Sequence, residues 1–365
     1  MTGAADAQSV RRSRRKNRDR GQQQPRQKVQ YTELDPAIRA PRHGWMIVAR
    51  KEFADLILSF RFLIVIGILG LAAGAAVYAT AGQLRQPGIA DAASKVPSLF
   101  LVLFAPPSSV APANLPSFIF LFSFLGPLLG IALGFDAIAG ERADGTLPRL
   151  LSQPIHRDDV INGKFVAGLA VVGLAFGAIM LLMGAVGIIQ LGVIPNPESI
   201  LRLLIWWVVS IVYVGFWLAF ALLCSVLLRR AAASALTSIA VWLVLTLFAF
   251  VLVGIVAGVL APAPADATTA QTIANLNMQE NLARLSPSTL FQESTEVILD
   301  PSVRTLSYVT TVLQLQNPST GAIPTLMTLD QSLLVIWPQV VALIALTVIA
   351  FAGAYIAFMR QEVRA

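Results

Sequence analysis

Six long stretches without Asp, Glu, Lys or Arg restrict what this sequence can fold into. They cover residues 62–84, 96–135, 165–197, 203–228, 231–265 and 331–359. A helix needs about 20 apolar residues to cross the hydrocarbon core of a bilayer, so each stretch is long enough to span it. Only 13% of the residues are charged and 56% are hydrophobic, whereas an ordinary soluble domain is about 25% charged. The sequence therefore predicts an all-α integral membrane protein with six transmembrane helices.

Proline and glycine content narrows the six stretches to the helices themselves. The predicted spans are 62–82, 117–135, 165–189, 203–228, 235–260 and 333–358. The segment 98–105, between Pro97 and Pro106, is too short to cross a bilayer. It is either a re-entrant or interfacial piece before the second span, or a plain external loop.

The distribution of basic residues predicts the orientation of the spans. With the N-terminus inside, 22 of the 27 Lys and Arg residues fall on the inner side. Basic residues near span ends favour the cytoplasmic side. We therefore expect a multi-pass protein of the cell membrane with both termini in the cytoplasm.

Two segments with different chemistry precede the first span. Residues 1–43 are polar and basic, which predicts a disordered cytoplasmic tail that is attracted to anionic membrane lipid. Nucleic acid is not expected as a partner, because no aromatic residue interleaves the basic block 11–20 to stack on bases. Residues 44–61 predict an amphipathic helix, either at the inner membrane interface or as a cytoplasmic extension of the first span. Its apolar face consists of Trp45, Ala49, Phe53, Leu56 and Phe60.

The remaining chain divides into three regions. Residues 62–260 hold spans one to five, with a cytoplasmic loop at 136–164, and residues 333–365 hold the sixth span and a short cytoplasmic tail. Between them, 261–332 is too long for a simple connection. It is either a small external cap or a disordered loop. Helical spacing favours some order in it, at Ile273, Leu276, Met278, Leu282 and Leu285.

The loop 136–164 carries the most specific pattern in the chain. Gly145 permits a sharp turn, Thr146 can cap the helix that follows, and Pro154 ends it. A helix this short is unstable alone and needs a partner surface. Three leucines share one face of it, and we expect them to project toward the cytoplasm as an apolar docking surface: Leu147, Leu150 and Leu151.

This segment resembles the loop of the ABC-2 type permease family, in the group that includes the membrane subunit of the nitrous-oxide-reductase maturation exporter. The family pattern is matched at Asp136, Ile138, Glu141, Gly145, Thr146, Leu147, Leu150, Leu151, Pro154, Arg157, Ile161, Gly163 and Lys164. The amphipathic segment 49–61 is also similar to the family's start. The resemblance covers roughly 44–260 and 333–365, and the tail and the external region match weakly.

The resemblance implies a permease subunit of an ATP-driven exporter. Its expected partners are a separate ABC ATPase subunit, which would use the ATP, and a second permease copy or a related permease. The residues implied to couple the permease to the ATPase are Glu141, Arg142, Gly145, Thr146, Leu147, Leu150, Leu151, Pro154 and Arg157. The alternative is a non-transporting, ABC-like membrane subunit with a sensing or anchoring role. The transported substrate is not indicated.

Several chemistries lack support in the sequence. The stretch 162–165 lacks the upstream Gly and the following Ser or Thr of a phosphate-binding loop, so ATPase activity is not expected on this chain. His43, His156 and Cys224 form no Cys/His cluster, so neither a metal nor another cofactor is predicted. The uncharged predicted spans disfavour an ion-coupled carrier.

Overall fold

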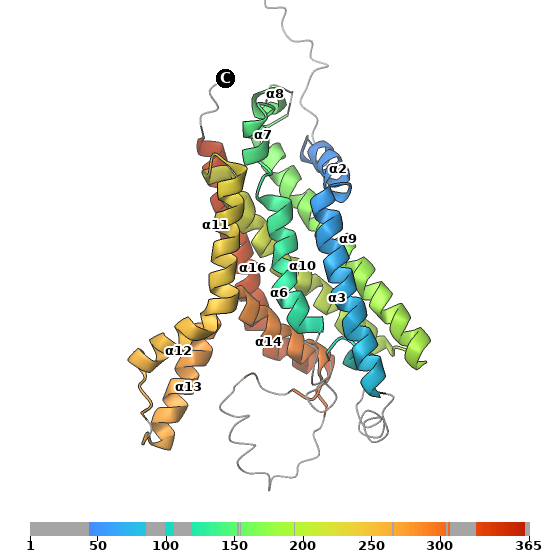
Figure 1. The fold of residues 1–365 in the computed structure, drawn as a ribbon, viewed down its shortest axis with the longest axis vertical. Coiled ribbons are helices and arrows are strands. Elements are labelled where there is room, and N and C mark those ends of the chain that lie inside the picture. Colours follow the sequence, from blue (N-terminus) through green and yellow to red (C-terminus); the bar gives the residue numbers. More distant parts are fainter. Residues whose placement is uncertain are drawn as a thin grey trace, which may run out of the picture. The chain divides into compact units, whose positions relative to one another are not determined.

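The computed structural model describes residues 44–84, 99–105, 118–151, 153, 155–192, 194–264, 266–303, 306 and 326–361. Within these ranges every regular element is helical (Figure 1), as predicted. The elements are α2 (Gly44–Ile57), α3 (Phe60–Leu84), α5 (Leu99–Val102), α6 (Phe118–Gly134), α7 (Ala139–Ala143), α8 (Leu147–Leu151), α9 (Arg157–Leu191), α10 (Pro197–Leu227), α11 (Ala231–Leu243), the π-helical η1 (Val244–Phe248), α12 (Ala249–Leu260), α13 (Thr269–Ala283), α14 (Pro287–Leu299) and α16 (Leu329–Arg360). The tail 1–43 lies outside the described residues.

The prediction of six spans is confirmed. Six helices are long and apolar enough to cross a membrane: Phe60–Leu84, Phe118–Ala143, Arg157–Gln190, Pro197–Leu227, Ala231–Leu260 and Leu329–Arg360. Several are longer than predicted because their polar first turns are capped and continue the helix. Asn196, for example, accepts a hydrogen bond from the backbone N–H of Ser199 at the start of α10.

The two ends of the bundle carry different segments (Figure 1). We call the end with α2, α7 and α8 the loop end. The opposite end, where α3 finishes and α10 and α16 begin, is called the hairpin end, after the hairpin of α12 and α13.

Helix α10 is the most buried of the spans. Of the 18 residues that form its most apolar stretch, 72% are buried. In the corresponding stretch of the span that contains α11, η1 and α12, only 6% are buried. The aromatic side chains of Trp206, Tyr213 and Trp217 are fully buried. Because α10 packs against α6, α9, α14 and α16, it positions the other spans relative to one another.

Three glycines bring α6 unusually close to α10. A Cβ added at Gly130 would lie 2.6 Å from the carbonyl oxygen of Val214, and one added at Gly134 would lie 2.8 Å from that of Leu218. Gly126 also faces Val214, at 3.4 Å from its side chain. Glycines four residues apart allow the backbones of membrane helices to touch, and this close packing stabilises their association.

The segment 98–105, for which two predictions were open, contains the short helix α5. Residues 100–104 are buried, at 5% exposure or less. Phe104 packs near Trp206 of α10, and Leu103 occupies the space that Gly187 of α9 leaves free. Residues 100–104 are therefore packed against the bundle, and both re-entry into the membrane and an external loop stay predictions.

The region 261–332 contributes a helix to the core, which the sequence did not predict. The helical spacing over 273–285 corresponds to α13, whose N-terminus has a capping box of Thr268 and Gln271. The following α14 packs against α6, α10 and α16. Phe291 stacks on Tyr213 with ring centroids 4.3 Å apart, and Gln292 donates to the Ser123 hydroxyl. This part of the predicted cap is thus part of the bundle.

A buried arginine joins α10, α14 and α16 at the hairpin end. Arg202 is 1% exposed and pairs with Glu198 one turn earlier. It also donates to the carbonyl oxygens of Ile298 and Met327 and to the Ser332 hydroxyl, at 2.7–3.1 Å. The span predicted at 203–228 was free of charge, but the helix begins earlier and contains this satisfied ion pair.

Replacing Gly130 by Ala should lower the free energy of unfolding by about 1–3 kcal/mol, because the new methyl group would overlap the α10 backbone. The matched control is Gly74→Ala in α3, where an added Cβ meets nothing within 4 Å. Both changes gain the same helix propensity. Thermal unfolding of the two variants in one detergent therefore isolates the packing effect, and equal melting temperatures would contradict the close contact.

Candidate functional site

The loop 136–164 folds into two short helices at the loop end, α7 and α8, before α9 begins (Figure 1). Gly145 turns the chain between them with φ of +66°, a conformation that favours glycine. Thr146 was predicted to cap α8, but its hydroxyl donates back to the carbonyl oxygen of Glu141. The Thr146 side chain therefore stabilises the turn after α7, and its hydroxyl hydrogen bonds to α7.

The leucine face of α8 does not project as predicted. Leu147 is 3% exposed and packs in an apolar cluster with residues of α9, α10 and α16, among them Val160, Leu222 and Phe358. Leu150 is half-buried against the same cluster. The expectation that Leu147 faces a partner is wrong, because the bundle itself offers an apolar surface to this short helix. The side chain of Leu151 and all of Pro154 lie outside the described residues.

The start of α7 is held by a side chain from α10. The hydroxyl oxygen of Ser225 accepts hydrogen bonds from the backbone N–H groups of Ile138 and Ala139, at 3.0 and 2.9 Å. These are N–H groups at a helix N-terminus, which have no partner within their own helix. Sequence reasoning missed Ser225, because a lone serine in an apolar stretch carries no signal of this contact.

Lys164 is a buried cation between two carboxylates. Its ammonium group lies 2.8 Å from Glu141 of α7 and 3.1 Å from Glu52 of α2, and its side chain is only 5% exposed. The second carboxylate oxygen of Glu141, Oε2, is buried and has no hydrogen-bond partner among the described residues. The ion pairs connect α2, α7 and α9, three elements that meet at the loop end.

Two further contacts connect this loop to the N-terminal helices. Arg61 of α3 forms an ion pair with Asp136 and lies over the Phe135 ring, 4.8 Å from its centroid. Gly163 allows α2 to lie directly on α9, since a Cβ there would come within 2.8 Å of Val48 and the Trp45 carbonyl oxygen. The spacing Asp136, Gly163, Lys164 therefore has a structural explanation.

Helix α2 ends earlier than the amphipathic pattern predicted. Ser59 separates α2 from α3, and its hydroxyl accepts a hydrogen bond from the backbone N–H of Phe62. Phe60, which was assigned to the apolar face of the predicted helix, therefore belongs to α3 and is 76% exposed. Trp45 and Ala49 lie partly or fully buried where α2 packs against α9. Placement of α2 at a membrane interface stays a prediction.

Two predicted coupling residues hold the end of α16. Arg142 donates to the side-chain oxygen of Gln361 at 2.6 Å, and Arg157 donates to the Gln361 carbonyl oxygen at 3.3 Å. The Gln361 amide in turn donates to the carbonyl oxygen of Val226 in α10. The loop is thus bonded to the last turns of two spans.

A small exposed surface remains after these internal contacts. It consists of residues 143–146 and Pro148, which we call the loop tip. His156, Arg229 and Arg230 are also exposed at this end. The described residues contain no group of three His, Cys, Asp or Glu side chains able to hold a metal ion. The loop end therefore presents a small exposed tip on a base that is held by ion pairs.

Lys164→Met should lower the free energy of unfolding by about 3–5 kcal/mol, because it leaves Glu52 and Glu141 without their shared cation in a buried site. The control is Lys51→Met, the same change at a lysine 60% exposed and 3.3 Å from Glu52. That variant should change by no more than about 1 kcal/mol. Urea unfolding followed by circular dichroism measures both, and similar losses would refute the role of burial.

The sequence of this chain is similar to those of known transporter proteins. The sequence profile of the ABC-2 family of transporter proteins matches residues 46–363. The probable ABC transporter permease protein NosY of Pseudomonas aeruginosa is 30% identical over 160 residues, which are 43% of this chain and 49% of that protein. A protein of the same name from Stutzerimonas stutzeri is 42% identical over 64 residues, which are 18% of this chain and 23% of that protein. The chain thus matches about half the length of the first relative and about a quarter of the second. By the match over most of its length, it belongs to the ABC-2 family of transporter proteins, as a multi-pass membrane subunit.

Proposed function

We propose that this chain is the permease subunit of an ATP-driven exporter. ATP would be bound and hydrolysed by a separate ABC ATPase subunit at the loop end, which faces the cytoplasm in the orientation inferred from the basic residues. A second copy of the chain, or a related permease, would complete the transporter. The similarity to proteins named as probable ABC transporter permeases supports this proposal.

The observation that carries the proposal is that the base of the loop tip is bonded to several helices of the bundle. This base is joined to α2 and α9 through Lys164, and to α3 through the ion pair of Arg61 with Asp136. It is joined to α16 through Arg142. A displacement of the tip by an ATPase would therefore move the inner ends of these helices together.

Six of the nine predicted coupling residues take three different tasks in this proposal. Gly145 and Thr146 are exposed at the loop tip and would contact the ATPase. Glu141, Arg142 and Arg157 bond to other parts of the chain and would transmit the motion. Leu147 anchors the tip from below through its buried side chain.

The test is a double substitution at the loop tip, Asp144→Arg with Pro148→Glu, in a chain co-expressed with its ABC ATPase. Both positions are exposed, so the fold should persist while the affinity for the ATPase falls by about tenfold or more. Co-purification of the ATPase on the tagged permease measures the loss.

The control is Asp55→Arg on α2. It reverses the charge of a side chain that is 63% exposed and is not part of the loop tip. It should leave co-purification unchanged. Equal ATPase recovery with all variants would refute docking at the tip. A complex that hydrolyses ATP but moves no candidate substrate would instead favour a sensing or anchoring role.

A further inference from the structure

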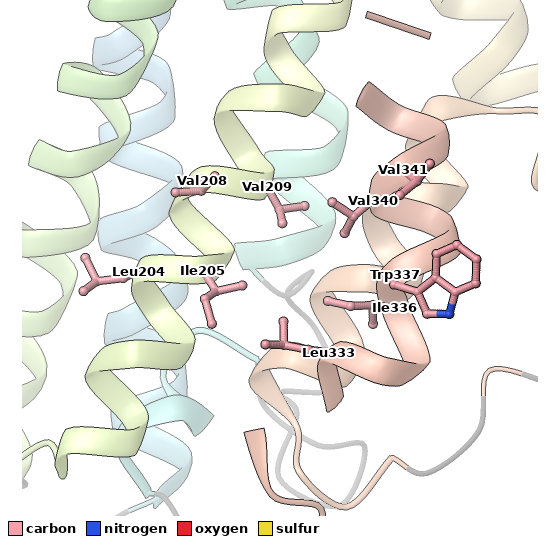
Figure 2. Close-up of a pocket in the computed structure, with 9 residues that line it drawn as sticks. All are labelled: Leu204, Ile205, Val208, Val209, Leu333, Ile336, Trp337, Val340 and Val341. Atoms are coloured by element: carbon pink, nitrogen blue, oxygen red, sulfur yellow. The ribbon is translucent and has the colours of Figure 1, made fainter. Parts of the chain in front are cut away.

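An apolar groove runs between α10 and α16 in the hairpin half of the bundle (Figure 2). Its volume is about 450 Å³. All nine lining residues are apolar: Leu204, Ile205, Val208, Val209, Leu333, Ile336, Trp337, Val340 and Val341. Val209 and Ile336 are buried at 4% and 1% exposure and form the floor, whereas Trp337 on the rim is 60% exposed. The groove is therefore open along its length on the outside of the chain.

The depth of the groove can be estimated from the starts of its two helices. On α10 its lining begins seven residues after Pro197, and on α16 four residues after Leu329. At 1.5 Å per residue it extends from about 6 to 18 Å below these helix ends. Half of the hydrocarbon core is about 15 Å thick. With these helix starts placed at the edge of the hydrocarbon, the groove would lie mostly in the leaflet at the hairpin end.

The mouth of the groove carries two carboxylates. Glu198 lies seven and eleven residues before the lining residues Ile205 and Val209, so helical periodicity places it on the same stripe. Asp330 has the same relation to Trp337 and Val341 on α16. Both acidic residues are exposed, Glu198 with 51% of its side chain. With Glu198 paired to Arg202, the mouth keeps a net negative charge through Asp330, which would attract a cationic group at the headgroup level and repel an anionic one.

The neighbouring cation Arg202 is paired with Glu198, so the unbalanced negative charge at the mouth is that of Asp330. Arg202 is 1% exposed, and its donors are committed to Glu198, Ile298, Met327 and Ser332. Because this guanidinium is engaged inside the bundle, it is not available to bind a phosphate at the mouth.

The volume of the groove indicates what can fill it. The groove holds about 450 Å³ along roughly 12 Å of the two helices, and its outer side is open. A single hydrocarbon chain is narrow enough to follow the groove and to restore the dispersion contacts that its lining otherwise lacks.

We propose that the groove binds one acyl chain of a phospholipid whose ammonium headgroup lies against Glu198 and Asp330. The lipid would fill the gap between α10 and α16 at the level where their side chains do not meet. The site uses the membrane-spanning part alone and does not depend on the proposed coupling to ATP.

Native mass spectrometry of the full chain tests this proposal, after purification in mild detergent with equal amounts of phosphatidylethanolamine and phosphatidylglycerol. We expect one phosphatidylethanolamine to be retained per chain. Val208→Trp with Val341→Trp would fill the groove and should lower that retention by about tenfold. The control pair is Val348→Trp with Ile349→Trp, two positions of α16 that are 59% and 68% exposed but lie outside the groove, and it should retain the lipid.

A second variant tests the headgroup. Asp330→Lys should leave a lipid bound but shift the preference from phosphatidylethanolamine toward phosphatidylglycerol. The proposal is overturned if the wild type retains no lipid, or if the filled variant retains as much as the wild type. It is also overturned if filling the groove abolishes a dimer without changing the lipid count, because a second copy would then cover the groove.

Discussion

The close contact of α6 with α10 is the constraint on which the rest of the bundle depends. In a bilayer, apolar side chains gain little by leaving lipid for another helix, so association depends on tight packing and polar contacts. Gly130 and Gly134 let the two backbones approach so closely that no methyl group would fit between them. Helix α10 also packs against α14, whose Phe291 stacks on Tyr213. Helices α6, α10 and α14 therefore form a frame against which α9 and α16 are placed.

In the described part of the chain each end of this frame carries a buried cation, and the two act in the same way. Lys164 at the loop end and Arg202 at the hairpin end are at most 6% exposed, and each is bonded to acceptors on neighbouring segments. Removing charges from water is costly, and breaking such a pair costs more than the pair contributes. Their effect is to specify geometry: Lys164 fixes α2 and α7 to α9, and Arg202 fixes α14 and α16 to α10.

The loop end combines this rigidity with a small exposed surface. The apolar side of α8 is used within the chain, where Leu147 closes a cluster between α9, α10 and α16. What remains outside is the polar turn at Gly145 and Thr146. In the proposed function a partner would therefore contact the turn, while the leucine and the ion pairs below it would carry the displacement into the spans.

Local properties of the sequence were enough to predict the six spans and to locate the loop 136–164. An uncharged stretch that is long enough to span a membrane can be recognised by itself, and the loop pattern lies within thirty consecutive residues. The partners of that loop were not predictable, because Ser225 and Gln361 are distant in sequence and each is an ordinary polar residue by itself. The same holds for α14, whose amphipathic sequence suits an external cap as well as the core. The sequence alone determined which segments cross the membrane and which one carries the family pattern. The tertiary structure decided which side of each segment is buried, because that depends on glycine spacing and polar groups meeting across helices far apart in the chain.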